Sequence, residues 1–253
     1  MPSMREGEGT RARLLASVVG VHYLGHAAFA LRFGGALTAV TDYGAPNAWA
    51  EWGWDSRIHD LGRLAPDVMT YSHTHHEDHF DSNRVPRGVR RVLRCGEAGA
   101  LGGVAISPIG LHETDLGEAD STAYLFTWRE FRVLHLGDCQ ADIVHIDDDE
   151  HRAWIRRVLP ERCDVMLLPI ESRQRFAAEA VTLLRLLRPV RAVPMHYWSE
   201  ETLEEFLRCV ESANGDLHVE RGVGTQLAAP LEETGRGTRV VPLVRAAFAG
   251  WRV

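Results

Sequence analysis

The residues that could carry chemistry are concentrated in one short segment, YSHTHHEDH, at positions 71–79. Its last seven residues contain four histidines and two carboxylates, directly behind an apolar run. Neutral imidazole and ionised carboxylate together suit a borderline divalent metal, Zn²⁺ first, with Mn or Fe as alternatives. His73 and His75 are spaced to face one ion, and Asp78 and His79 to reach a second. The segment therefore predicts a metal site.

Further polar residues stand where apolar segments end. Eight apolar runs bounded by turn residues predict strands: 18–24, 27–33, 37–41, 68–72, 104–110, 132–136, 165–170 and 192–195. Besides the histidine segment, the residues that follow these strands include Asp42, His112, Asp138, Glu171 and His196. Strands that each deliver one histidine or acid at a terminus are typical of a sheet whose edge carries a site.

Helices are predicted between the later strands. Residues 178–188 are rich in Leu and Ala and stop at Pro189, which cannot continue a helix. Residues 199–214 begin with Ser199 as a cap and end at Asn214-Gly215. A strand-rich first half followed by alternating helices and strands predicts two sheets with helices outside.

Composition excludes several classes of function. The net charge of −7 argues against a dedicated nucleic-acid binder. All 28 basic residues are arginine, which excludes Schiff-base lysine chemistry and a Gly-Lys-Ser/Thr phosphate loop. The four cysteines lie far apart with no Cys-x-x-Cys pair, which favours reduced thiols and a cytoplasmic protein.

Length and pattern indicate one domain. The 253 residues, 45% of them hydrophobic, are enough to bury a full core. Residues 1–13 are polar and Gly-rich and predict a disordered tail, with residues 14–253 as a single domain. The apolar stretch 14–21 is too short to span a membrane.

Five short motifs together resemble the metallo-β-lactamase superfamily, and within it the branch similar to L-ascorbate-6-phosphate lactonase. The resemblance covers about residues 22–224, and no single motif would be decisive. In family order the motifs are Tyr23-Leu24-Gly25-His26-Ala27-Ala28-Phe29, the strand ending at Asp42, the histidine segment with the isolated His112, Gly137-Asp138-Cys139 and Pro194-Met195-His196-Tyr197.

The resemblance implies an α+β fold, an αββα sandwich of two packed mixed sheets with helices on the outer faces. It also implies two divalent metal ions: the first held by His73, His75 and His112, the second by Asp78, His79 and His196, with Asp138 as a bridge. Asp78 and Asp138 would then also be catalytic. Such a pair lowers the pKa of a shared water and polarises the oxygen under attack. Asp42, and with less support His26, would orient a ligating imidazole.

The chain departs from the family in the histidine segment. The family pattern His-x-His-x-Asp-His becomes His-x-His-His-Glu-Asp-His, one residue longer. Anchoring the pattern on His73 selects His75 as the second ligand, whereas anchoring it on Asp78-His79 selects His76. We prefer an insertion that keeps both ends functional, and the choice between His75 and His76 stays open. One metal ion instead of two is an alternative outcome.

A second departure lies in the expected substrate pocket. A Tyr follows Asp42 where the family usually has Pro, and three tryptophans then fall within six residues. Their indoles could wall a pocket over the metals, or pack against the domain. Glu171 and Arg173 replace the usual Pro-x-Gly-Gly ending. The predicted pocket residues are Tyr43, Trp49, Trp52, Trp54, Glu171, Arg173 and Tyr197.

Three functions are compatible with these residues. The first is a metal-dependent hydrolase acting on a small-molecule lactone or phosphoester, with hydroxide as the nucleophile. The second is a di-iron redox protein of the same fold. The third is a binding or sensor protein whose altered loop weakens catalysis. The expected partner is a small-molecule substrate, with no nucleic acid and no membrane; a homo-oligomer is conceivable by analogy alone.

Overall fold

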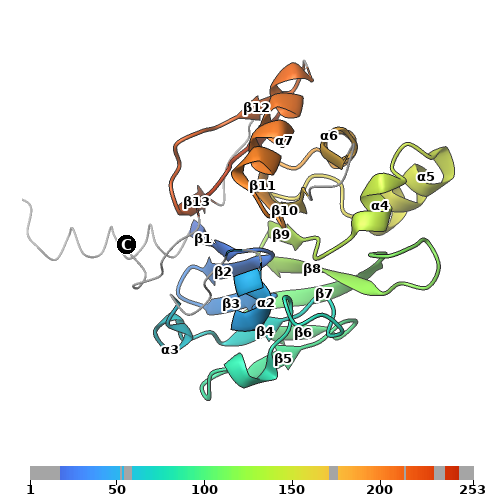
Figure 1. The fold of residues 1–253 in the computed structure, drawn as a ribbon. Helices are drawn as coiled ribbons and strands as arrows, with labels where there is room; N and C mark the ends of the chain where they lie inside the picture. Colours follow the sequence, from blue (N-terminus) through green and yellow to red (C-terminus); the bar gives the residue numbers. More distant parts are fainter. Residues whose placement is uncertain are drawn as a thin grey trace, which may run out of the picture.

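The computed structural model describes residues 18–51, 53, 59–170, 176–213, 215–230 and 237–244. The predicted tail, residues 1–13, lies outside them. The described residues form fourteen strands in two mixed sheets (Figure 1). The first has six strands in the order β13-β1-β2-β3-β4-β5: Gln226–Pro230, Val18–Gly25, Ala28–Phe33, Leu37–Thr41, Val68–Thr70 and Arg91–Leu93.

The second sheet has eight strands in the order β12-β14-β11-β10-β9-β8-β7-β6. β8 pairs antiparallel with β7 and β9, whereas β9, β10, β11, β14 and β12 run parallel. The strands, in that order, are Leu217–Val219, Thr238–Val240, Arg191–Met195, Val165–Pro169, Phe131–His135, Ser121–Trp128, Val104–Leu111 and Gly99–Leu101.

The parallel pairs decide where a site can form. In the first sheet β3 pairs in parallel with β4, and in the second β9, β10 and β11 are parallel neighbours. The carboxyl ends of parallel neighbours lie at one edge of a sheet, so residues that follow them are brought together. This arrangement confirms the predicted delivery of polar residues by successive strands to a common edge.

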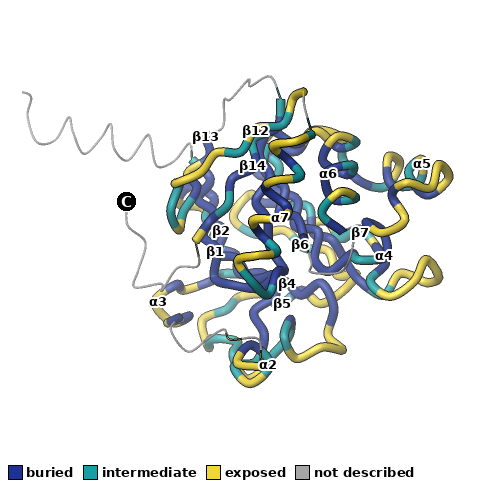
Figure 2. The backbone as a smooth tube through the Cα atoms, turned by 45° about the horizontal axis from the view of Figure 1, so that its top comes forward, coloured by how far each residue is buried: buried dark blue, intermediate teal, exposed yellow. Residues whose placement is uncertain are grey.

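The alternation of side chains along β2 builds two apolar layers. Phe29, Leu31 and Phe33 join the large core cluster between the sheets, and Ala28 and Ala30 join a smaller one on the other face. Because side chains of a strand alternate between faces, both faces of this sheet must be covered. Figure 2 shows the central strands buried, with exposed residues on α5, on α7 and in loops.

Helices cover the outer faces. α2 (Pro46–Glu51) and α3 (Leu61–Leu64) supply Trp49, Leu61 and Leu64 to the smaller cluster on the first sheet. The later helices are α4 (Gln140–Val144), α5 (Asp149–Val158), α6 (Phe176–Leu187) and α7 (Glu200–Ser212); α6 and α7 lie beside β10–β12 (Figure 1). A short 3₁₀ helix, η2, spans Ser82–Arg84.

The two predicted helices are present as α6 and α7. The Ser199 side chain caps α7 by accepting a hydrogen bond from the Thr202 N–H at 3.3 Å, as its position predicts. The predicted α+β sandwich of two packed mixed sheets is confirmed. Within the described part of the chain, no helix is long and apolar enough to cross a bilayer.

Candidate metal centre

The site forms where strand ends of the two sheets meet. The His196 N–H, just after β11, donates to the carbonyl oxygen of His26, in the β1–β2 turn, at 2.9 Å. His26, Asp42 and His196 have left-handed backbones, with φ of 51°, 37° and 55°. Non-glycine residues in this region are strained, and such residues cluster at functional sites. Three site residues therefore share an uncommon conformation at three different strand ends.

Two glycines allow the loops of the site to touch. A Cβ on Gly44 would lie 1.9 Å from the Asp78 carbonyl oxygen, so only glycine admits the histidine segment at that distance. Gly137 has φ of +63°, and a Cβ there would lie 2.5 Å from the Cβ of Ser72. The segment after β3 thus packs directly on the backbone of the histidine segment, and the segment after β9 packs on the Ser72 side chain.

Three imidazoles from separate segments converge in what we call the buried cluster: His26, His79 and His196. Their side chains are 1–2% exposed. The Nε2 atom of His79 lies 2.9 Å from the Nε2 of His26 and 3.2 Å from the Nε2 of His196. The sequence suggested only that His26 might orient a ligand, yet its ring nitrogen lies among those of the predicted ligands.

Asp42 fixes the orientation of His79. Its Oδ2 lies 3.0 Å from His79 Nδ1, and its two oxygens accept hydrogen bonds from the Ser72 N–H at 2.7 Å and the Ser72 hydroxyl at 2.6 Å. Burial opposes ionisation, but the bond from His79 and the Ser72 donor outweigh it and hold the pKa of Asp42 at about 2. An ionised carboxylate only accepts, so His79 Nδ1 carries the proton and its Nε2 presents a lone pair.

Two more carboxylates border the buried cluster. Asp78 Oδ2 lies 3.3 Å from His26 Nε2, and Asp138 Oδ2 lies 3.3 Å from His196 Nε2. Burial raises the pKa of Asp138, but His196 and His79 outweigh it and hold that pKa well below its usual range. Asp78 behaves alike, with His26 and His79 outweighing burial. Both acids are therefore charged and available as ligands.

A second group, which we call the loop cluster, comprises His73, His75, His76 and Glu113. Glu113 Oε2 lies 3.5 Å from His73 Nδ1 and 3.2 Å from His75 Nε2, and Oε1 lies 3.3 Å from His76 Nε2. His73 is buried, whereas the side chains of His75 and His76 are 47% and 53% exposed. Burial and the Asp138 carboxylate raise the pKa of Glu113 to about 8. Glu113 was not predicted as a site residue.

His112, predicted as a ligand of the first metal, has other partners. Its N–H donates to Asp142 Oδ2 at 2.7 Å, and its Nδ1 lies 2.9 Å from Asp142 Oδ1. Its ring packs against Trp154 with centroids 5.1 Å apart. Asp142 is also contacted by His151 Nε2, at 3.2 Å. His112 thus belongs to a bonded group on the side of α4 and α5.

The chemistry of the donor set fits divalent metal ions. Among the described residues, three groups place one potential ligand atom of each member within 4.8 Å of the others: His26, His79 and His196; His73, Asp78 and His79; and His73, His75 and Glu113. The buried atoms His73 Nε2, Glu113 Oε2 and Asp138 Oδ1 make no hydrogen bond within the described part of the chain. Buried polar atoms are normally satisfied, so these three atoms, on two residues of the loop cluster and on Asp138 beside the buried cluster, indicate a cation as the missing partner.

The predicted pocket residues fall into three sets. Tyr43 and Trp49 are fully buried; Trp49 Nε1–H donates to the Asp78 carbonyl at 2.7 Å, and the Tyr43 hydroxyl accepts from Arg84 Nη2–H at 2.9 Å. Both side chains are therefore packed in the core, and Trp49 holds the backbone of the histidine segment through its hydrogen bond. Tyr197 borders a cavity. The remaining four lie outside the described residues: Trp52, Trp54, Glu171 and Arg173.

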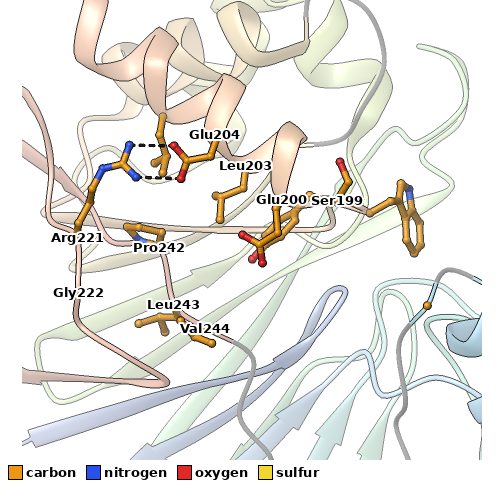
Figure 3. A pocket seen from close by; sticks show the side chains of 13 residues that line it. Ser199, Glu200, Leu203, Glu204, Arg221, Gly222, Pro242, Leu243 and Val244 are labelled. Carbon is orange, nitrogen blue, oxygen red and sulfur yellow. Dashed lines mark hydrogen bonds and ion pairs between the residues drawn. The ribbon is translucent and has the colours of Figure 1, made fainter.

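A cavity of about 470 Å³ lies beside the centre. Trp198 lines it and also stacks on His26, with centroids 4.5 Å apart at 25°. Leu203 and Leu243 point into it, and the pair formed by Glu204 and Arg221 closes one end (Figure 3). Trp198 is thus a wall shared by the buried cluster and the cavity, a role that no sequence pattern indicated.

Comparison with protein families agrees with this geometry. The profile described as "Beta-lactamase superfamily domain" matches residues 20–196. The chain belongs to the β-lactamase superfamily. The matched range begins in β1 and ends at His196, so the superfamily domain contains both clusters. No curated protein matches the chain.

Solved structures share the superfamily fold. A candidate zinc-dependent hydrolase of the metallo-β-lactamase superfamily from Thermotoga maritima is 22% identical, with a TM-score of 0.58, over 89% of this chain and 100% of that one. A candidate metal-dependent hydrolase from Parabacteroides distasonis is 16% identical, TM-score 0.55, over 77% and 89%. The metallo hydrolase Igni18 from Ignicoccus hospitalis is 20% identical, TM-score 0.52, over 78% and 92%. These likenesses establish the fold.

Proposed function

We propose that this protein is a metal-dependent hydrolase of small-molecule esters, with a lactone as the favoured substrate class. The observation that carries the proposal is the convergence of histidine and carboxylate ligand atoms from both sheets, beside three buried polar atoms that make no hydrogen bond within the described part of the chain. Divalent ions bound there would lower the pKa of a water and polarise the oxygen of a carbonyl or phosphoryl group.

Residues of the centre have separate roles in holding the metal ions and in accepting a proton. Asp42 keeps the proton of His79 on Nδ1 and so keeps its Nε2 a ligand. Asp138 and His196, which follow β9 and β11 of the second sheet, would bind the metal ions from that sheet. Asp78 is partly exposed and lies 3.3 Å from His26 Nε2 at the edge of the buried cluster, and we assign it the proton released when water attacks.

Charge in the neighbouring cavity favours a lactone over a phosphoester. Arg221 is its cationic lining residue, and it binds Glu204 at 2.9 Å and Glu211 at 3.3 Å, so its charge is already compensated. Glu200 adds a negative charge. A neutral, partly apolar substituent packed on Trp198 and Leu203 suits this lining better than a phosphate. The resemblance of the sequence motifs to the L-ascorbate-6-phosphate lactonase branch also supports a lactonase, with a phosphodiesterase as the competitor.

The first experiment is elemental analysis of protein purified without a nickel column, followed by assays on lactones and phosphodiesters. We expect two equivalents of zinc or manganese per chain and hydrolysis of lactones that chelation abolishes and metal restores. Iron with no hydrolysis would favour a di-iron redox protein instead. Metal binding without turnover across both substrate classes would favour a binding protein.

The cavity has its own test. Leu203→Trp should fill it and raise KM for the lactones that are hydrolysed, with kcat less affected, because the substitution leaves the centre unchanged. Val144→Trp, at a residue 45% exposed on α4 and outside the cavity lining, is the matched control. Equal KM in the two variants would place the substrate elsewhere.

A further inference from the structure

Two neighbouring residues after β7 compete for one role, because adjacent residues of an extended chain point to opposite sides. The His112 ring bonds to Asp142 through Nδ1 and packs on Trp154, and none of the three candidate ligand groups among the described residues includes it. The Glu113 side chain contacts all three of His73, His75 and His76. Of the two residues, Glu113 is therefore the one whose side chain contacts the loop histidines.

The backbone holds Glu113 in this position from two directions. Its N–H donates to Asp120 Oδ1 at 2.7 Å, and its carbonyl accepts from the Ala141 N–H at 3.2 Å. The side chain is only 8% exposed, and its Oε2 accepts no hydrogen bond from the described residues. Glu113 is thus a buried carboxylate that its backbone bonds hold in place beside three imidazoles. Because its Oε2 accepts no hydrogen bond from the described residues, it is a candidate ligand for a cation.

We propose that Glu113, and not His112, completes the metal site that His73 and His75 begin. The inference rests on the proposed metal dependence. It replaces three imidazoles by two imidazoles and one carboxylate, which adds a negative charge and a harder oxygen donor. Carboxylate ligands suit Mn better than imidazole does, so the site should be less selective for zinc than a three-histidine site.

His112 then acts as an anchor. Its two bonds to Asp142 tie the end of β7 to α4 and set the chain direction at Glu113. Loss of its ring should loosen the loop without removing a ligand. This difference between a ligand and an anchor is measurable on metal binding alone.

The test compares Glu113→Gln, His112→Gln and the control Glu118→Gln, an exposed acid in the same loop with the same charge change. Metal content and the dissociation constants for Mn²⁺ and Zn²⁺ are the readouts, and thermal melting checks folding. Glu113→Gln should lose one ion, or weaken its affinity by more than about 100-fold, the upper range for residues that only support a ligand. His112→Gln should lower Tm and weaken the same site by about 10-fold or less.

A second pair of variants distinguishes the loss of a ligand from misfolding of the protein. Glu113→His supplies a third imidazole and should lower the dissociation constant for Zn²⁺ relative to that for Mn²⁺; Glu113→Asp keeps the charge and should bind between wild type and Glu113→Gln. Loss of an ion in His112→Gln but not in Glu113→Gln would overturn the assignment while leaving the metal-dependent function intact. Absence of bound metal in the wild-type protein would overturn both.

Discussion

The two halves of the centre are held in different ways. His26, His79 and His196 of the buried cluster are 1–2% exposed, and His26 and His196 stand at strand ends. His75 and His76 of the loop cluster lie in a turn and are about half exposed. The fold itself places the first half, whereas the second depends on one loop and on the carboxylate of Glu113.

This contrast indicates which part of the centre tolerates a change in sequence. A residue next to a strand end, such as His26 or His196, cannot move without disturbing a sheet, and His79 is tied to Asp42, which follows β3. A turn can accept an extra residue at low cost, and the histidine segment has done so. We therefore expect changes in the buried cluster to be severe and changes in the loop cluster to be graded.

The largest effect is expected at Asp138, the carboxylate that borders the buried cluster at His196. Asp138→Asn keeps the shape of the side chain but removes the charge that faces His196 at 3.3 Å. We predict lower metal content and a fall in kcat/KM of at least about 10³-fold, with far-ultraviolet circular dichroism unchanged. Asp147→Asn, at an exposed position, is the control. Full activity in Asp138→Asn would remove Asp138 from the centre.

The next effect concerns the support of the buried cluster. Asp42→Asn breaks its bonds with His79 and Ser72, and removing one partner of a buried pair costs about 3 kcal/mol of unfolding free energy. The pKa of Asp42 is depressed to about 2, so its contribution is present at neutral pH and is lost as pH falls from about 4 to 2.

Denaturant unfolding of metal-free wild type and Asp42→Asn at several pH values checks this. The gap between the two proteins should be widest near pH 7 and should narrow at the acid end of the series. A gap independent of pH would mean that the Asp42 carboxylate is not ionised against His79.

A backbone contact offers a milder way to disturb the loop. Gly44→Ala would force a Cβ against the Asp78 carbonyl, so we predict a loss of about 2 kcal/mol in stability and weaker metal binding. Gly35→Ala, where a Cβ would have open space, should change stability by less than about 0.5 kcal/mol. Equal effects in the two variants would show that the segment after β3 does not position the histidine segment.

The smallest effect is expected at His76 of the loop cluster. His73 is buried and His76 half exposed, so His73→Ala should weaken metal affinity by more than about 100-fold and His76→Ala by about 10-fold or less. Titration of each variant with Zn²⁺ checks the order, with the exposed His218→Ala as control. The reverse order would shift the pattern of ligands by one residue and select His76.

The sequence predicted the features that depend on local pattern. Polar residues behind apolar runs indicated the strand ends at Asp42, His73, Asp138 and His196, and a serine cap with an apolar stripe indicated α7. β8 was not predicted, because Ser121–Trp128 buries residues on both faces and so lacks a clear alternation.

Features that depend on side-chain direction could not be predicted. Nothing in the pair His112-Glu113 says which residue faces the histidines; the bond from His112 to Asp142, 30 residues away, decides it. The burial of Tyr43 and Trp49 depends likewise on α2 and on the Asp78 carbonyl. The ligand set, the number of ions and the substrate stay predictions for the experiments above.

The hydrogen bond between His196 and the carbonyl of His26 joins residues 170 positions apart, and it has a consequence for folding kinetics. Contacts of such long sequence separation form late, because the loop between them must close first. During synthesis, the buried cluster cannot exist until β11 has been made and the second sheet has docked. Metal uptake should therefore coincide with the last folding step, and a bound ion should act chiefly by slowing unfolding.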